Sequence, residues 1–214
     1  MGKLIVLEGI DGTGKSTQYE LLQQYLTAQS IPFRALTYPD YADPSSTLVR
    51  MYLAGKFGTS PDSVNAYAAG TFYAVDRYAS FVRYWREDYQ KGVLCLACRY
   101  TTSNAVHQGA KLDPAEREAY FAWLRDFEFT KIGIPEPSQV FLLDLPAEVA
   151  LNNIRKRAEK QDIHETDTEY LCRCVESAHD AADYFGWTRI LCCDDEGNMR
   201  SREDISAEII ARMK

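Results

Sequence analysis

The chain has 214 residues, of which 46% are apolar, and it carries a formal net charge of −7. A chain of this length buries enough apolar surface for one core of ordinary size. Proteins that coat nucleic acids or anionic membranes need a positively charged surface. The negative net charge of this chain therefore argues against both of these classes. Residues 1–6 are typical of a strand rather than a cleaved signal, and no apolar run approaches the ~20 residues that cross a bilayer. We therefore expect a cytoplasmic protein without nucleic-acid or membrane partners.

Short apolar runs alternate along the chain with longer segments of helical periodicity. The short runs are rich in Val, Ile, Leu, Phe and Cys and are apolar on both faces, as in a parallel sheet covered by helices. They predict strands at 3–8, 33–38, 93–98, 140–144 and 189–193. The segments of helical period predict helices near 14–29, 45–55, 62–90, 101–111, 114–129, 146–159, 167–185 and 202–213.

This alternation of strands and helices predicts an α/β fold with three layers, in which helices flank a five-stranded, mostly parallel sheet. No internal repeat, low-complexity stretch or long linker divides the chain, so we expect one domain over 1–214. The polar segment 159–167 lies between two predicted helices. It is either an ordinary connection or part of a short lid, at about 155–168, that closes over phosphates.

Residues 9–16, Gly-Ile-Asp-Gly-Thr-Gly-Lys-Ser, match the G-x-x-x-x-G-K-[ST] pattern of a phosphate-binding P-loop. Its glycines let backbone N–H groups point at an anion, and the following helix adds its positive end. Lys15 would reach the β- and γ-phosphates of a nucleotide, and the Ser16 hydroxyl would bind Mg²⁺. The motif therefore predicts a P-loop NTPase fold. The predicted ATP-binding residues are Gly9, Ile10, Asp11, Gly12, Thr13, Gly14, Lys15, Ser16 and Thr17.

A P-loop by itself does not define the reaction. A GTPase would need Asn-Lys-x-Asp or Thr-Lys-x-Asp to bind guanine, but the nearest segment, Thr-Lys-Ile-Gly at 130–133, lacks the aspartate. The Asp-x-x-Gly segment at 194–197 comes too late in the chain to be a switch after the second or third strand. The sequence therefore favours a phosphotransferase over a GTPase.

The six cysteines occur as close pairs at positions 95 and 98, 172 and 174, and 192 and 193. The first pair forms Cys-x-x-Cys, a spacing found in zinc and redox sites. However, this pair lies in a predicted strand, where side chains three apart point to opposite faces. We therefore expect free cysteines that pack as small hydrophobic side chains in a reducing compartment.

Four more segments are distinctive when they are combined with residues 7–17. They are Tyr-Pro-Asp-Tyr at 38–41 with Tyr-Leu-Ala-Gly at 52–55, Tyr-Ala-Val-Asp-Arg at 73–77, Arg-Tyr-Thr-Thr-Ser-Asn-Ala-Val-His-Gln at 99–108, and Arg-Lys-Arg at 155–157. Over essentially its full length the chain thus resembles the bacterial thymidylate kinases, a family of P-loop nucleoside monophosphate kinases. The resemblance implies transfer of the γ-phosphate of ATP to dTMP, a requirement for Mg²⁺, and a homodimer.

The resemblance also implies roles for residues beyond the P-loop. Tyr73 would stack on the thymine ring, and Arg77, one helical turn later on the same face, would bond a thymine carbonyl. Asp11 would accept a hydrogen bond from the sugar 3′-hydroxyl. Arg99, just past the third strand, would bind the acceptor phosphate. The residues expected to line the sugar and base are Ser103, Asn104, His107 and Gln108.

Catalysis in this family rests on positioning and charge stabilisation, and the acceptor phosphate needs no dedicated base. The P-loop of this chain lacks the extra arginine that some family members carry. The resemblance therefore implies that the mobile cations come from the lid, which makes Arg155 and Arg157 catalytic candidates beside Lys15 and Arg99. A solvated basic helix face is the alternative interpretation of Arg155 and Arg157.

Two positions depart from the family pattern. Cys98 stands where the family usually has an aspartate, and a thiol is a poor ligand for Mg²⁺, which prefers hard oxygen atoms. Asp40 stands near the place where many relatives have an arginine, so Arg99 would carry more of the contact with the acceptor phosphate. Two alternatives stay open: a related P-loop kinase for another nucleotide or deoxynucleoside, and a kinase-like regulatory protein that binds nucleotide with little turnover.

Overall fold

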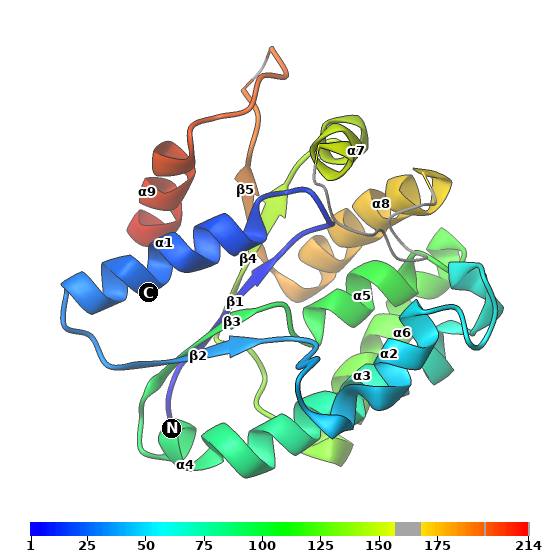
Figure 1. Ribbon diagram of the computed structural model, residues 1–214, viewed down its shortest axis with the longest axis horizontal. Coiled ribbons are helices and arrows are strands. Elements are labelled where there is room, and N and C mark those ends of the chain that lie inside the picture. Colours follow the sequence, from blue (N-terminus) through cyan, green and yellow to red (C-terminus); the bar gives the residue numbers. More distant parts are fainter. Residues whose placement is uncertain (157–167, 195, 214) are drawn as a thin grey trace.

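The computed structural model describes residues 1–156, 168–194 and 196–213. Within these residues the strands form one sheet in the order β2-β3-β1-β4-β5, and every neighbouring pair is parallel. The predicted α/β fold is confirmed, with a sheet that is parallel throughout (Figure 1). The strands are β1 (Leu4–Glu8), β2 (Phe33–Thr37), β3 (Leu94–Cys98), β4 (Gln139–Asp144) and β5 (Thr188–Leu191).

The helices follow the predicted periodicity, with three differences. The helix expected at 45–55 begins with a 3-10 turn and is α-helical only over 47–53. The segment 62–90, expected as one helix, is broken: a 3-10 turn ends at Ser63, Val64 and Asn65 are extended, and the helix resumes as α3, a π-helical turn and α4. The helix expected to end at 129 continues to 132, because α6 passes into a second π-helical segment. The α-helices are α1 (Lys15–Ala28), α2 (Thr47–Leu53), α3 (Ala66–Ser80), α4 (Arg86–Gln90), α5 (Thr102–Gly109), α6 (Pro114–Arg125), α7 (Ala147–Arg155), α8 (Thr168–Phe185) and α9 (Arg202–Arg212). The other turns are η1 (Pro44–Ser46), η2 (Pro61–Ser63), η3 (Phe81–Trp85) and η4 (Asp126–Ile132).

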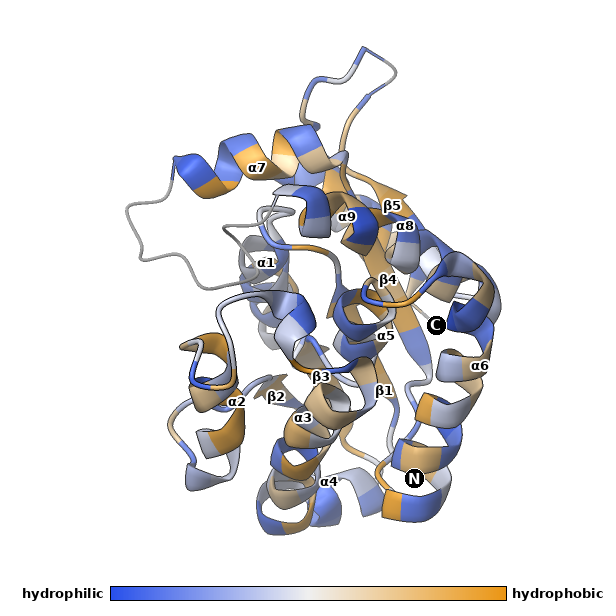
Figure 2. Cartoon of the chain, turned by 90° about the vertical axis from the view of Figure 1, so that its right-hand side faces the viewer, coloured by the Kyte–Doolittle hydropathy of each residue, from blue (hydrophilic) through white to orange (hydrophobic). Residues whose placement is uncertain are grey.

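Helices cover both faces of the sheet, with α1 and α9 on one side and α3, α5, α6 and α8 on the other (Figure 1). All five residues of β1 are buried. Ile5 belongs to a core cluster with Leu22 of α1 and Ile209 of α9, whereas Leu4 belongs to a cluster with Trp85. In Figure 2, which colours the chain by hydropathy, the strands are mostly apolar and are enclosed by helices that carry hydrophilic residues on their outer faces. Burial on both faces explains why the strands are nearly uniformly apolar.

The carboxyl ends of β1 and β3 lie side by side, since Leu7 pairs in register with Cys98. The P-loop leaves β1 at this edge, and the segment leading into α5 leaves β3 there. Open parallel sheets bind their ligands at the carboxyl ends of their strands. The two segments that the sequence analysis selected for function are thus brought together by strand pairing.

All six cysteines are free, and Cys95, Cys98, Cys174 and Cys192 are buried as expected. The expected burial is wrong for Cys172, which is exposed, and Cys193 is only partly buried. In the described part of the chain, no group of three or more His, Cys, Asp or Glu side chains is placed to hold a metal ion. None of the helices in that part combines the length and apolar composition needed to cross a membrane.

Helices α5 and α8 approach each other closely at Gly109. A Cβ atom at this position would lie 2.4 Å from Oγ of Ser177 and 3.1 Å from the Phe121 ring. Ser177 is itself buried, and its hydroxyl donates to the carbonyl of Ala105 at 2.8 Å. The glycine therefore allows α8 to pack directly against the helix that carries residues 103–108.

We expect Gly109→Ala to lower the free energy of unfolding by about 1–3 kcal/mol, because an added methyl group overpacks this contact. Urea denaturation of the variant against the parent measures the loss. In a Ser177→Ala background the loss from Gly109→Ala should be smaller, since the atom in closest conflict is then removed. An equal loss in the parent and in the Ser177→Ala background would contradict the steric explanation.

Candidate active site

The P-loop connects β1 to α1 through two glycines in the left-handed region, Gly12 (φ 84°) and Gly14 (φ 87°). Glycine adopts this backbone region without steric cost, which is why the motif requires it. At Gly12 there is also no room for a side chain, because a Cβ atom would lie 2.4 Å from the carbonyl oxygen of Ala150 in α7. The first turn of an α-helix leaves backbone N–H groups without intrahelical partners and carries the positive end of the dipole, so the start of α1 favours an anion.

Lys15 is buried, with only 7% of its surface exposed. Its ammonium group donates to the carbonyl of Ile10 at 2.7 Å and lies 3.8 Å from Oδ1 of Asp11. Burial, together with the nearby guanidinium of Arg99, lowers the pKa of Lys15 to about 8, although Asp11 opposes the shift. The ammonium group of Lys15 is therefore poorly solvated. A bound phosphate would stabilise its charged form.

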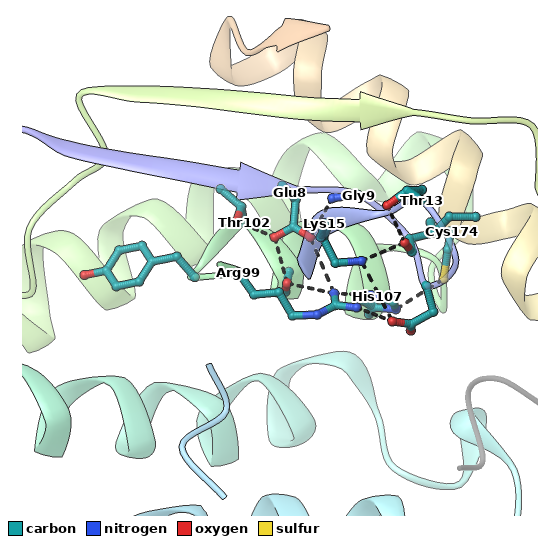
Figure 3. Close-up of polar contacts among 12 residues, drawn as sticks. Glu8, Gly9, Thr13, Lys15, Arg99, Thr102, His107 and Cys174 are labelled. Atoms are coloured by element: carbon teal, nitrogen blue, oxygen red, sulfur yellow. Dashed lines mark hydrogen bonds and ion pairs between the residues drawn. The ribbon is translucent and has the colours of Figure 1, made fainter. Parts of the chain in front are cut away.

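Arg99 lies at the centre of the polar contacts at this edge of the sheet (Figure 3). Its Nη2 pairs with the Asp11 carboxylate, while Nη1 lies 3.1 Å from Nε2 of His107 and 3.3 Å from Oγ of Ser103. The backbone of Arg99 is in the left-handed region (φ 65°), an uncommon conformation for a residue other than glycine. Such conformations cost energy and gather at functional sites.

Glu8 was not selected by the sequence analysis as a site residue, yet it holds this cluster together. Its carboxylate is fully buried and accepts from the backbone N–H of Gly9 at 2.9 Å. It also accepts from the hydroxyls of Thr102 (2.5 Å) and Ser103 (2.7 Å), and Nη1 of Arg99 lies 3.5 Å away. The available signal was an acidic residue ending an otherwise apolar strand directly before the P-loop.

A cavity of about 280 Å³ opens beside the P-loop. Two arginines, Arg77 and Arg99, lie in its lining. Aromatic rings from the segment after β2, from α3 and from the segment after β3 form much of the remaining wall. Every residue that the resemblance implied for substrate binding lies in its lining: Asp11, Tyr73, Arg77, Arg99, Ser103, Asn104, His107 and Gln108.

Arg77 and Asn104 do not act in isolation, because both contact one buried carboxylate. Nε and Nη2 of Arg77 donate to Glu128 at 2.7 and 2.5 Å, and Nδ2 of Asn104 donates to Glu128 at 3.0 Å. Glu128 is fully buried in η4 and was missed by the sequence analysis. Its only sequence signal was an acidic residue between two phenylalanines in a helix expected to be amphipathic.

His107 and Gln108 are both buried at the cavity wall. Since arginine can only donate, Nε2 of His107 accepts from Arg99, while Nδ1 lies 3.6 Å from Sγ of Cys174. Among the contacts of the described residues, Oε1 of Gln108 has no hydrogen-bond partner. A buried acceptor of this kind favours a ligand or water that donates to it.

The lid candidates are described only in part. Arg155 is the last residue of α7 and is exposed, whereas Arg157 lies outside the described residues, as does most of the segment 155–168. Helix α7 itself packs on the P-loop, because Nδ2 of Asn153 donates to the carbonyl of Gly12 at 2.9 Å. Arg155 is therefore carried by a helix that is anchored directly to the loop.

Ser16, the predicted metal ligand, and Cys98, which departs from the family pattern, differ in accessibility. Ser16 is exposed in the first turn of α1. Cys98 is almost fully buried at the end of β3, and burial raises the pKa of its thiol, so that it is neutral at physiological pH.

A parallel sheet of this strand order, with a complete P-loop after its first strand and a cavity lined by an arginine and aromatic rings beside it, defines a P-loop kinase. A sequence profile of the thymidylate kinase family matches residues 7–199. The chain belongs to the thymidylate kinase family.

Named relatives cover most of the chain. The thymidylate kinase of Mycobacterium tuberculosis is 31% identical over 172 residues, which span 78% of this chain and 79% of the relative. That of Afipia carboxidovorans is 33% identical over 161 residues, spanning 74% and 66% of the two chains. That of Prochlorococcus marinus is 27% identical over 222 aligned residues, spanning 100% and 96%.

The environment of Lys15 predicts the pH dependence of nucleotide binding. Because the pKa of Lys15 is lowered to about 8, the free protein loses this positive charge as the pH rises through that value. We expect kcat/KM for ATP to fall above about pH 8, and ATP binding there to take up protons, since bound phosphates restore the charge. The pH profile of kcat/KM measures the first effect. Calorimetric titration with ATP in buffers of different ionisation enthalpy measures the proton uptake.

Lys15→Arg is the matched control, because a guanidinium stays charged across this range. Its activity should be lower, but the fall near pH 8 should disappear. If Lys15→Arg keeps the same descending limb, another group is responsible for it. Lys15→Ala should abolish phosphoryl transfer while leaving the fold intact.

Proposed function

We propose that this protein transfers the γ-phosphate of ATP to dTMP, giving dTDP and ADP. The observation that carries the proposal is the cavity beside the P-loop. Its lining includes Arg99, which can bind a phosphate, and Tyr73, which can stack on a base. Arg77 and Asn104 supply polar groups that can form hydrogen bonds with the edge of that base. Arg99 and Lys15 both contact Asp11, so the anion site of the loop and the cavity meet at one carboxylate.

The donor nucleotide is bound by the nine P-loop residues 9–17, and Lys15 contacts its β- and γ-phosphates. In the cavity, Arg99 binds the acceptor phosphate, and Asp11 accepts from the sugar 3′-hydroxyl. Tyr73 stacks on thymine, Arg77 donates to a thymine carbonyl, and the rest of the wall is formed by Ser103, Asn104, His107 and Gln108.

The chemistry proposed is direct transfer. An oxygen of the dTMP phosphate forms a bond to the γ-phosphorus of ATP while the bond to the β–γ bridging oxygen breaks, and ADP leaves. Lys15 and Arg99 neutralise the charge of the transferring group, and Arg155 and Arg157 add cations when the lid closes. The catalytic unit is one domain over 1–214, with the lid at about 155–168.

The residues present fit a magnesium ion that binds together with the nucleotide. Mg²⁺ commonly keeps several waters and takes few protein ligands besides substrate phosphates. The exposed hydroxyl of Ser16 would hold it, and when bound the ion would neutralise phosphate charge. Glu8 already accepts from Gly9, Thr102, Ser103 and Arg99, and Asp11 is paired with Arg99, so neither carboxylate is presented as a dedicated ligand.

The acceptor is tested by assaying ADP release from ATP and Mg²⁺ with dTMP, dUMP, dCMP, dAMP, dGMP and thymidine in turn. We expect dTMP to give the highest kcat/KM. A higher value for another acceptor would support the related-kinase alternative. ATP binding without ADP release for any acceptor would support a regulatory protein, and the neutral Cys98 at a position of family aspartate is the feature that favours that outcome.

Tyr73→Ala should weaken dTMP binding by about 1–3 kcal/mol through loss of stacking, with little change in the affinity for ATP. Calorimetric titration with each nucleotide separates the two effects. Weaker ATP binding with unchanged dTMP binding would mean that the donor and acceptor sites are reversed.

Cys98→Asp should lower the Mg²⁺ concentration that gives half-maximal activity, because a carboxylate replaces a neutral thiol beside the P-loop. The affinity for dTMP should hardly change. Activity across a Mg²⁺ titration and the Tm are measured together, since an unpaired charge at a buried strand end would cost stability. Cys98→Ser is the neutral control. A stable Cys98→Asp variant with an unchanged Mg²⁺ curve would show that position 98 does not serve the metal.

We also propose that the protein acts in the cytoplasm as a homodimer, as the family resemblance implies. Helices α2 and α3 contact each other and carry exposed apolar side chains that an interface would cover. Among them are Leu48, Met51, Val75 and Tyr78. Light scattering of the purified protein measures the mass, and Val75→Glu should lower it if α3 lies in the interface.

A further inference from the structure

Glu128 is a fully engaged buried carboxylate beside the cavity, although it is not part of the cavity lining. Oε1 accepts from Nη2 of Arg77 (2.5 Å) and from Nδ2 of Asn104 (3.0 Å). Oε2 accepts from Nε of Arg77 (2.7 Å) and from the hydroxyl of Thr101 (2.9 Å). A carboxylate has about four lone-pair sites, so these four donors use its whole capacity.

The backbone of Glu128 is held as firmly as its side chain. Its carbonyl accepts from the N–H groups of Gly133 (3.0 Å) and Ile134 (3.2 Å), where η4 ends. π-helical turns are uncommon and occur often at functional sites. This turn brings a charged side chain from the end of α6 against residues of α3 and α5, which are separated from it by 51 and 24 positions in the sequence.

An ionised carboxylate can only accept hydrogen bonds, and this property fixes the orientation of Asn104. Both N–H groups of its amide are used, one by Glu128 and the other by the carbonyl of Gly70 at 3.1 Å. The polar atom that remains is Oδ1, which is an acceptor. Asn104 therefore enters the cavity wall as an acceptor and not as a donor.

The same carboxylate fixes the orientation of Arg77. Its Nε and Nη2 form a two-pronged ion pair with Glu128, which orients the plane of the guanidinium. Nη1 points away from that pair, and it donates to the carbonyl of Tyr100 at 3.3 Å. Nη1 carries two N–H groups, so Arg77 enters the cavity wall as a donor.

We propose that Glu128 is a positioning residue that sets the hydrogen-bond polarity with which the cavity recognises a base, a role that rests on the proposed function. A donor from Arg77 beside an acceptor from Asn104 matches a pyrimidine that has a carbonyl at C4 and an N–H at N3, as thymine and uracil do. Cytosine presents the opposite pattern, an amino group at C4 and an acceptor at N3. Glu128 thus selects against dCMP without touching the nucleotide.

The test is Glu128→Gln, which keeps the shape of the side chain but replaces one acceptor oxygen by a donor. The hydroxyl of Thr101 can turn to accept from that donor, but Arg77 cannot. Each carboxylate oxygen accepts from Arg77, so in either amide orientation the new NH2 faces an N–H of Arg77 and one bond of the pair is lost. We expect KM for dTMP to rise about tenfold or more, with kcat within about threefold of the parent and KM for ATP unchanged. The ratio of kcat/KM for dTMP to that for dCMP should fall about tenfold or more.

Asp180→Asn is the matched control, because it weakens the ion pair of a second buried arginine, Arg117, which bonds Asp180 at 2.7 Å between α6 and α8. It should lower the Tm and leave both KM values and the dTMP-to-dCMP ratio unchanged. If Asp180→Asn changes KM for dTMP as much as Glu128→Gln does, general loosening explains the effect and the proposal is wrong.

Glu128→Asp covers the case in which Glu128→Gln does not fold, since it keeps the charge and withdraws the carboxylate by one methylene. We expect it to raise KM for dTMP about fivefold or more while kcat is largely kept. An unchanged KM for dTMP and an unchanged dTMP-to-dCMP ratio in either folded variant would overturn the proposal. If the parent protein itself does not phosphorylate dTMP, the proposed function fails first, and that result is visible before any variant is made.

Discussion

The contacts of Arg99 are the constraint on which the site depends. One guanidinium joins the P-loop at Asp11, the end of β1 at Glu8, and the first two turns of α5 at Ser103 and His107. The left-handed backbone of Arg99 directs the side chain back across the sheet edge, and the surrounding bonds offset the cost of that conformation. If Arg99 were released, the P-loop and the cavity beside it would no longer share a fixed geometry.

Charge balance explains how four ionisable groups are packed together at this edge. Glu8 and Asp11 bring two negative charges, and Lys15 and Arg99 bring two positive ones, so the buried cluster is compensated as a whole. The neutral thiol of Cys98 preserves that balance, whereas a carboxylate at the same place would add a third negative charge. Incoming phosphates would compete with Asp11 for both cations, which links nucleotide binding to rearrangement of these pairs.

Much of the fold and the site could be predicted because their signals are local. Uniformly apolar strands predict a parallel sheet, and the P-loop pattern requires a strand before it and a helix after it. The i,i+4 spacing of Tyr73 and Arg77 placed both on one helix face, and both line the cavity. The π-helical turns could not be predicted from the sequence. Such a turn inserts an extra residue into the helix where tertiary packing favours it, and this insertion barely changes the hydrophobic periodicity.

The sequence by itself determined the class of fold, the phosphate-binding loop and many of the side chains that line the cavity beside that loop. Only the tertiary structure decided which buried carboxylates hold those side chains in place. Glu8 meets Ser103 across 95 positions and Glu128 meets Arg77 across 51, and no spacing rule relates residues so far apart. A single acidic residue in an apolar strand or between aromatic rings has the same local pattern whether it is paired or exposed. Its partners are set by strand register and helix packing, since a buried charge is stable only where the completed fold brings donors to it.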